Sequence, residues 1–155
     1  MALRPLPIVW QRLVSAEGQT CDRCGATHEA LQRAVAKLKQ VLAPLGLEPV
    51  FETKEISEDS FKTDPSASNR VWIAGRALEE WLGADVGASR CCSVCGESEC
   101  RTVKIEGVVF EAIPEGLIIR AALVAAAQVV GSVSEAGSSQ ANDACCQPAC
   151  CATAH

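Results

Sequence analysis

Two cysteines, Cys21 and Cys24, stand between an apolar run and an amphipathic segment. Residues 7–14 are mostly apolar, which predicts a buried strand, and residues 25–43 repeat apolar side chains at helical spacing, which predicts a helix. The two thiols then lie at the N-terminus of that helix, where unpaired N–H groups and the helix dipole favour a thiolate over a thiol. Thiol chemistry is therefore expected to be central, as electron exchange, metal binding or both.

The rest of the chain is expected to form short elements around this strand and helix. The patterns predict a strand at residues 47–56, a loop or single helical turn at 57–69, a strand at 70–75, a short helix or strand at 77–82, a cysteine-rich loop at 83–100, a hairpin at 102–113 that turns at Glu106 and Gly107, and a helix from Pro114 that ends before Gly131. This order predicts an α/β fold in which a small mixed sheet is flanked by helices and carries a cysteine-rich loop insertion.

The composition changes after residue 131. Residues 1–131 are expected to form one domain with an ordinary hydrophobic core. Residues 132–155 are rich in Ser, Gly, Ala and Gln, and such a segment cannot bury enough apolar surface to offset the entropy of ordering it. We predict a disordered, cysteine-rich C-terminal tail.

Charge and hydropathy exclude two classes of partner. The net charge is −5 and aromatic residues make up 4%, which argues against a nucleic-acid surface. The longest apolar run, residues 117–130, is interrupted by Arg120 and is shorter than the roughly 20 residues of a membrane span. Residues 1–14 show no secretory signal. The expectation is a soluble, cytoplasmic protein without nucleic-acid or membrane partners.

Ten cysteines are unusual for a cytoplasmic chain, where they indicate metal ligands or redox chemistry rather than a disulfide framework. In the redox hypothesis Cys21 attacks a disulfide and Cys24 resolves the mixed disulfide. Arg23 would stabilise a thiolate and Asp22 would oppose it. His28 follows on the same helix face as a proton shuttle, a third ligand or simply a solvated side chain.

A second group of cysteines lies between Arg90 and Arg101, whose charges would favour thiolates. A CxxC pair followed by glycine is typical of a zinc knuckle, and with the first pair it would complete a tetrahedral Cys₄ site. In the redox alternative the same cysteines would pass electrons from the first pair. The candidate ligands of the core are Cys21, Cys24, Cys91, Cys92, Cys95 and Cys100.

The tail contains two vicinal cysteine pairs, Cys145–Cys146 and Cys150–Cys151. Adjacent thiols on a flexible chain can wrap a soft ion such as zinc, copper(I), mercury(II) or arsenic(III). The tail is interpreted either as an arm that captures and delivers such an ion or as a low-complexity end without a role. The predicted partners are thus protein thiols and disulfides, or soft metal ions.

The sequence gives little support for other kinds of catalytic site. The glycines are too scattered for a phosphate-binding loop, and two histidines do not support a Ser/His/Asp hydrolase. The acidic pairs Glu79–Glu80 and Glu58–Asp59 are expected to be solvated surface residues.

Taken together, five motifs resemble an uncharacterised prokaryotic family, a domain of unknown function regarded as thioredoxin-like. They are Cys21-Asp-Arg-Cys24, Ile73-Ala-Gly75 with the following Leu78-Glu-Glu, Cys92-Ser-Val-Cys95, Cys100-Arg-Thr-Val103 and Ile113-Pro114. The resemblance covers roughly residues 7–130. It implies a thioredoxin-like fold and a functional set of Cys21, Cys24, Cys92, Cys95 and Cys100.

One position departs from the wider thioredoxin pattern, which places a proline just before the third strand, opposite the CxxC pair. Here Ser68, Asn69 and Arg70 precede Val71, and Pro65 is the nearest proline. This departure argues against a generic disulfide reductase. The sequence leaves three hypotheses: a thiol–disulfide oxidoreductase, a soft-metal sequestering or trafficking protein, and a protein with structural zinc.

Overall fold

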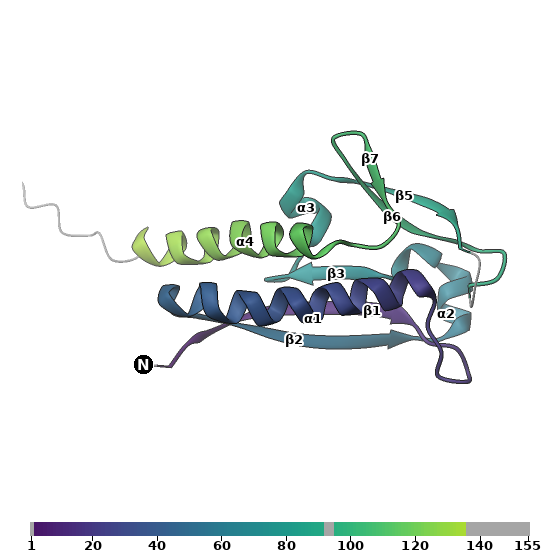
Figure 1. Ribbon diagram of the computed structural model, residues 1–155, viewed down its shortest axis with the longest axis horizontal. Coiled ribbons are helices and arrows are strands. Elements are labelled where there is room, and N and C mark those ends of the chain that lie inside the picture. The colour runs from purple at the N-terminus through teal and green to yellow at the C-terminus, as the bar shows by residue number, and fades with distance from the viewer. Residues whose placement is uncertain (1, 92–94, 136–155) are drawn as a thin grey trace, which may run out of the picture.

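The structure is a computed structural model that describes residues 2–91 and 95–135. Its elements, labelled in Figure 1, are β1 (Arg4–Leu13), α1 (Asp22–Leu42), β2 (Leu47–Ile56), α2 (Glu58–Thr63), β3 (Arg70–Ile73), β4 (Arg76–Ala77), α3 (Leu78–Leu82), β5 (Asp85–Arg90), β6 (Glu99–Ile105), β7 (Val108–Phe110) and α4 (Glu115–Glu135). Two short 3₁₀ turns, η1 (Ala43–Leu45) and η2 (Pro65–Ala67), follow α1 and α2.

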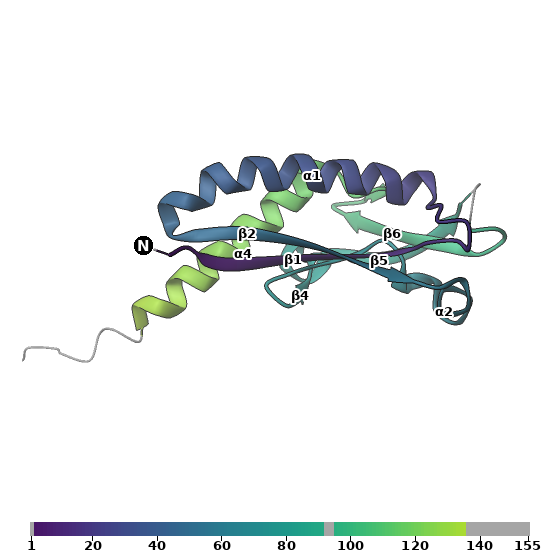
Figure 2. The same cartoon turned by 90° about the horizontal axis from the view of Figure 1, so that it is seen from below.

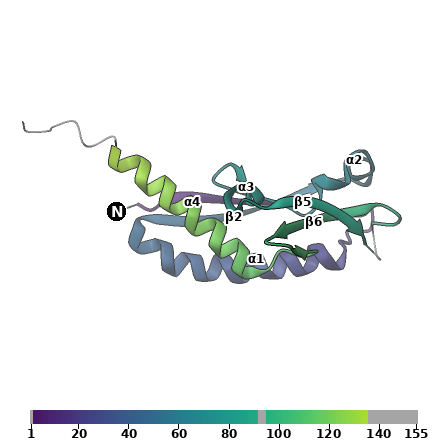
Figure 3. The same ribbon diagram turned by 90° about the horizontal axis from the view of Figure 1, so that it is seen from above.

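The first sheet is mixed and has the strand order β2-β1-β3-β4. β1 and β2 run parallel from the pair Arg4–Leu47 to the pair Leu13–Ile56, and α1 makes the crossover between them. β3 pairs with β1 in the antiparallel direction, and β4 pairs with β3. Figures 2 and 3 show α1 along one side of this sheet and α2 on the other. The predicted α/β fold with a mixed sheet and flanking helices is confirmed.

The apolar periodicity of α1 explains its position. One face of the helix is buried, at Cys24, Thr27, Ala30, Leu31, Ala34, Val35, Leu38 and Leu42. This stripe packs on the sheet, whose fully buried Leu6, Ile8 and Trp10 alternate along β1 as inward-facing strand residues do. The strand and the helix around the first CxxC pair therefore share one core.

A second sheet, antiparallel and ordered β5-β6-β7, lies between α3 and α4 in the chain. The β6–β7 hairpin turns at Glu106 and Gly107, whose φ angles are 49° and 83°. Two consecutive left-handed residues are typical of the type I′ turn that joins tightly paired strands, so the predicted hairpin turn is confirmed.

Three predicted elements differ from the structure. The cysteine-rich segment 83–100 was expected to be a loop, but Asp85–Arg90 is a strand paired with β6. Its residues are mostly exposed, so they lack the apolar alternation that marks a strand. The segment 57–69 contains the helix α2 as well as η2. Finally, α4 continues past Gly131 to Glu135 instead of ending at the glycine.

α4 is the one described helix that is long and apolar enough to cross a membrane, judged by length and composition over Glu115–Ser132. The helix instead packs beside α1, and Ala121, Ala122, Ala125 and Ala126 are buried in the common core. Small side chains allow the two helices to approach closely, and a core helix passes the same composition test as a membrane span. This packing accounts for the four buried alanines, whereas Leu123 and Val124 of the same helix are exposed.

Candidate metal centre

Four cysteines from separate parts of the chain meet at the N-terminus of α1. The Sγ atoms of Cys21, Cys91, Cys95 and Cys100 all lie within 4.8 Å of one another, and all four residues are buried. Cys21 precedes α1, Cys91 follows β5, and Cys100 is on β6. The group therefore joins the start of α1 to the second sheet.

Cys21 is the N-cap residue of α1. Its φ of −75° and ψ of 163° are extended, and its Sγ accepts a hydrogen bond from the Cys24 N–H at 3.5 Å. Hydrogen bonds from the Cys100 and Cys24 thiols lower the pKa of Cys21 well below its usual range, although burial opposes them. Cys21 is thus the sulfur of the group that carries negative charge most readily.

The neighbouring thiols shift in the opposite direction. Burial raises the pKa of Cys95 to about 12. The hydrogen bond to Cys21, followed by burial, raises the pKa of Cys100. In the metal-free protein the raised pKa values of Cys95 and Cys100 favour their thiol forms. A bound metal ion would displace those protons, because thiolates and not thiols are metal ligands.

Cys24 lies beside this group but is not one of the four. Its Sγ is 3.6 Å from the Ser68 Oγ, and its hydrogen bond to Cys21, together with burial, raises its pKa. The Ser68 hydroxyl also accepts a hydrogen bond from the Leu13 N–H at 3.0 Å. Ser68 thus contacts the CxxC pair from the segment just before β3. No interpretation of the sequence singled out this serine as a contact of Cys24.

The Arg23 guanidinium does not act as the expected partner of a thiolate. It donates to the Ser89 carbonyl at 3.3 Å, to the Ser89 hydroxyl at 2.9 Å and to the Arg90 carbonyl, and it pairs with Glu111 at 2.9 Å. These contacts hold the end of β5, directly before Cys91, against the first turn of α1. Arg23 therefore positions the residues next to the cluster, and its charge is paired with Glu111 instead of with a thiolate.

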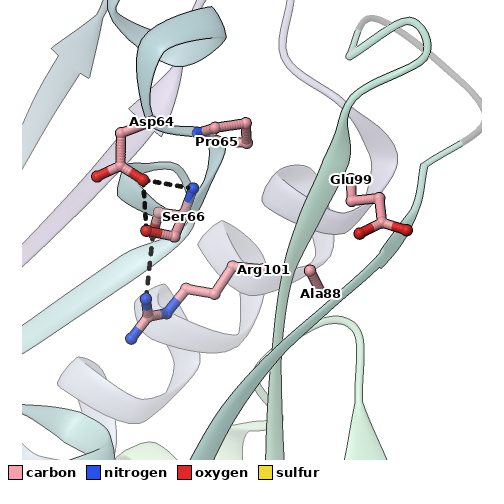
Figure 4. Close-up of a pocket in the computed structure, with 6 residues that line it drawn as sticks. All are labelled: Asp64, Pro65, Ser66, Ala88, Glu99 and Arg101. Atoms are coloured by element: carbon pink, nitrogen blue, oxygen red, sulfur yellow. Dashed lines mark hydrogen bonds between the residues drawn. The ribbon is translucent and has the colours of Figure 1, made fainter.

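Arg101 and Glu79 form a buried ion pair. Their side chains are 5% and 11% exposed, so the prediction that Glu79 is a solvated surface residue is wrong. Figure 4 shows Arg101 extending from β6 toward η2, where it also donates to the Ser66 carbonyl at 3.1 Å. Successive strand residues point to opposite sides, so Arg101 points away from the side of β6 that carries Cys100. The pair holds the second sheet against α3.

The cavity in Figure 4 has a volume of about 360 Å³ and lies beside Arg101. Its other polar groups include Asp64, which accepts from the Ser66 N–H at 3.1 Å and from the Ser66 hydroxyl at 2.5 Å. Asp64 and Arg101 are thus each paired with other residues, and the remaining carboxylate of the lining, Glu99, is exposed.

His28 is placed away from the four sulfurs. Its ring stacks on Trp10, with ring centroids 5.0 Å apart and planes 18° from parallel. Burial, and to a lesser extent the charge of Arg12, lowers the pKa of His28. The candidate role of third ligand beside Cys21 and Cys24 has no support from this arrangement.

Of the predicted core ligands, the structure brings together Cys21, Cys91, Cys95 and Cys100, and it places Cys24 beside them. Cys92 and the tail residues Cys145, Cys146, Cys150 and Cys151 lie outside the described residues. The chain thus has a cysteine cluster that can bind a metal ion.

Comparison with known proteins gives a family match over most of the chain. Residues 6–122 match the family described as "Domain of unknown function (DUF2703)". An uncharacterized protein of Archaeoglobus fulgidus is 45% identical over 113 residues, which cover 73% of this chain and 82% of the relative. No solved structure matches. The family match extends from β1 into α4 and includes every cysteine of the cluster, and on this match the chain belongs to the DUF2703 family.

Proposed function

We propose that the protein binds a thiophilic metal ion through Cys21, Cys91, Cys95 and Cys100 and serves to sequester or traffic that ion. The observation that carries the proposal is the meeting of four buried sulfurs within 4.8 Å of one another. Buried thiols at the start of α1, after β5 and on β6 would stabilise the fold less than apolar side chains at the same positions, unless a ligand bound to them. The reason is that thiolate charge is costly to bury.

The donor set fits a four-coordinate ion. Zinc with four thiolates is tetrahedral with Zn–S distances of about 2.3 Å, which corresponds to sulfur–sulfur distances of about 3.8 Å. The four sulfurs would need to contract by only about 1 Å to reach that geometry. Soft thiolates also accept copper(I), mercury(II) and arsenic(III), so zinc is the practical probe rather than the only candidate.

A handling role, rather than a purely structural one, is supported by the number of thiols. Cys24 is a fifth buried sulfur beside the four, and the chain carries four more in Cys145, Cys146, Cys150 and Cys151. A structural zinc site needs four ligands and no additional thiols. We place the protein in the cytoplasm as a soluble protein, because reduced cysteines persist there.

Native mass spectrometry of protein purified without oxygen tests the proposal. Replacement of all four tail cysteines by serine provides a background in which only core thiols bind metal. We expect this protein to retain one zinc ion, Cys100→Ser to lose it, and Cys24→Ser to keep it. The same zinc content in Cys100→Ser and its parent would refute the four-sulfur site.

A thiol–disulfide oxidoreductase is the second candidate, with Cys21 as the attacking and Cys24 as the resolving thiol. The CxxC pair begins a helix within a βαβ unit, as in thioredoxin-like redox motifs. The lowered pKa of Cys21 and the raised pKa of Cys24 also suit a nucleophile and its partner. The opposing observation is burial, since Cys21 is 3% exposed and a protein disulfide could not reach it without local opening.

An assay with a reduced protein and a protein disulfide substrate separates the two candidates. The oxidoreductase hypothesis requires turnover with a dithiol reductant and complete loss of turnover in Cys21→Ser. The metal-binding proposal expects no turnover above that of the reductant alone.

A further inference from the structure

Among the residues that the structure describes, the metal-binding function leaves one buried thiol, Cys24, without a role. Cys24 is 1% exposed and belongs to none of the four ligand positions, yet it lies directly beside Cys21. Its neighbours are Cys21, whose Sγ accepts the Cys24 N–H, and Ser68, whose hydroxyl is 3.6 Å from its sulfur. Cys24 therefore does more than fill space in the core, because its thiol forms a hydrogen bond with Cys21, a candidate metal ligand.

Cys21 therefore belongs to two groups at once. It is one of the four sulfurs of the metal centre, and it is the first member of a dithiol pair with Cys24. Residues three apart at a helix start bring their sulfurs into reach of each other. A disulfide between Cys21 and Cys24 would withdraw one of the four ligands and leave Cys91, Cys95 and Cys100.

We propose that Cys24 couples metal release to the reduction of a small disulfide, an activity that rests on the metal-binding function proposed above. Cys21 attacks the disulfide RSSR, forms a mixed disulfide with one half, and expels the other half as the thiolate RS⁻. Cys24 then attacks the Cys21 sulfur, forms the Cys21–Cys24 disulfide, and expels the second half, which takes the Cys24 proton and leaves as RSH. The two cysteines lose two electrons, RSSR gains them, and the metal ion leaves a site reduced to three thiolates.

The size of the disulfide follows from access to the cluster. Cys95 lines a surface cavity of about 190 Å³ together with Phe61 and Lys62 of α2. A low-molecular-weight disulfide can enter a space of this size, whereas a folded protein cannot. Because the Cys95 and Cys21 sulfurs are within 4.8 Å, a disulfide admitted at Cys95 is also near Cys21.

The test uses the full-length chain with the four tail cysteines replaced by serine, loaded with zinc. Hydroxyethyl disulfide is the substrate, zinc release is followed with a coloured chelator, and the disulfides formed are mapped by mass spectrometry. The matched control is Cys24→Ser, which retains all four ligands. Cys24→Ala is a second control in case the buried serine impairs folding.

We expect one zinc ion released for each Cys21–Cys24 disulfide formed, and release slowed by about tenfold or more in both controls. Without Cys24 the mixed disulfide on Cys21 is not resolved, and attack by the expelled thiolate returns Cys21 to the metal site. Equal rates of zinc release in the parent and in both controls would overturn the proposal. A disulfide from Cys21 to Cys91, Cys95 or Cys100 would overturn it too. A parent that binds no zinc but still forms the Cys21–Cys24 disulfide would refute the metal site and the coupling together, and would leave the redox candidate standing.

Discussion

The two parts of the molecule that build the cluster hold their cysteines in different ways. Cys21 is fixed locally, as the N-cap of a long helix whose apolar face is buried against its own sheet. Cys91, Cys95 and Cys100 surround a short connection in the second sheet, which is tied to the rest by Arg23 and by the Arg101–Glu79 pair. The comparison indicates that one part of the site is fixed by a helix on its own sheet. The other part is held by long-range polar contacts together with the apolar packing of Val103 and Ile105 in the common core.

The largest expected effect is loss of the metal ion. Structural zinc in small domains contributes about 10–16 kcal/mol of binding free energy, so loss of one of four ligands should weaken zinc binding by several orders of magnitude. We expect this result for both Cys21→Ser and Cys100→Ser in a competitive chelator titration.

Cys21→Ser also sharpens the comparison in the metal-free state. Serine is a strong N-cap, so Cys21→Ser should leave the thermal unfolding of the metal-free protein nearly unchanged. A large loss of stability in metal-free Cys21→Ser would contradict the description of Cys21 as a cap that serine can replace.

Removal of one partner of the buried ion pair should be the next largest effect. Glu79→Ala leaves Arg101, at 5% exposure, without its carboxylate, and unfolding by urea should show a loss of about 3–5 kcal/mol. The double variant Glu79→Met with Arg101→Met removes both charges and should recover most of that loss. If the double variant does not recover stability, the ion pair contributes more to stability than the free energy needed to bury its two charges.

A smaller effect is expected where the second sheet returns to α1. The Thr27 hydroxyl accepts a hydrogen bond from the Ile113 N–H at 3.0 Å, and Thr27 is fully buried. Thr27→Val leaves that N–H without a partner and should cost about 1–3 kcal/mol in urea unfolding. Thr27→Ser keeps the hydroxyl, and a loss as large as that of the valine variant would assign the effect to packing instead.

The pH dependence of metal binding tests the two parts of the site together. The pKa of Cys95 is about 12 and that of Cys100 is also raised, so both are protonated at pH 7 in the metal-free protein. The metal-bound protein holds fewer protons, and its binding free energy should therefore strengthen as pH rises, by about 1.4 kcal/mol per pH unit for each proton released. Calorimetry in buffers of different ionisation enthalpy counts those protons, and binding independent of pH would contradict thiol ligands.

The elements that sequence reasoning found are those defined by neighbouring residues. β2 was predicted with its observed bounds, α1 nearly so, and the turn at Glu106 and Gly107 by its position in the hairpin. These features depend on apolar periodicity and turn chemistry within short windows. β5 was missed because its residues face solvent and its strand character comes from pairing with β6. Gly87 fits this pairing, because a Cβ there would lie 2.9 Å from the Thr102 hydroxyl across the pair.

The membership of the cluster could not be predicted for a related reason. Spacing pairs Cys21 with Cys24, but the first is a cap residue and the second lies in the first helical turn, next to Ser68. That Cys91, Cys95 and Cys100 all meet Cys21 depends on how the second sheet packs against α1. That packing rests on Arg23 and on Glu79, whose partners are 66 and 22 residues away in sequence.

The two sheets share no strand pairing within the described residues, and this separation has a consequence for hydrogen exchange. The amides of β5, β6 and β7 can become exposed to solvent by local opening while those of β1, β2 and β3 stay protected. A ligand that binds only the closed form raises the free energy of that opening by RT ln(1 + [L]/Kd). The exchange rates of the second sheet would then report the concentration of free metal around the protein, and the rates of the first sheet would serve as an internal reference.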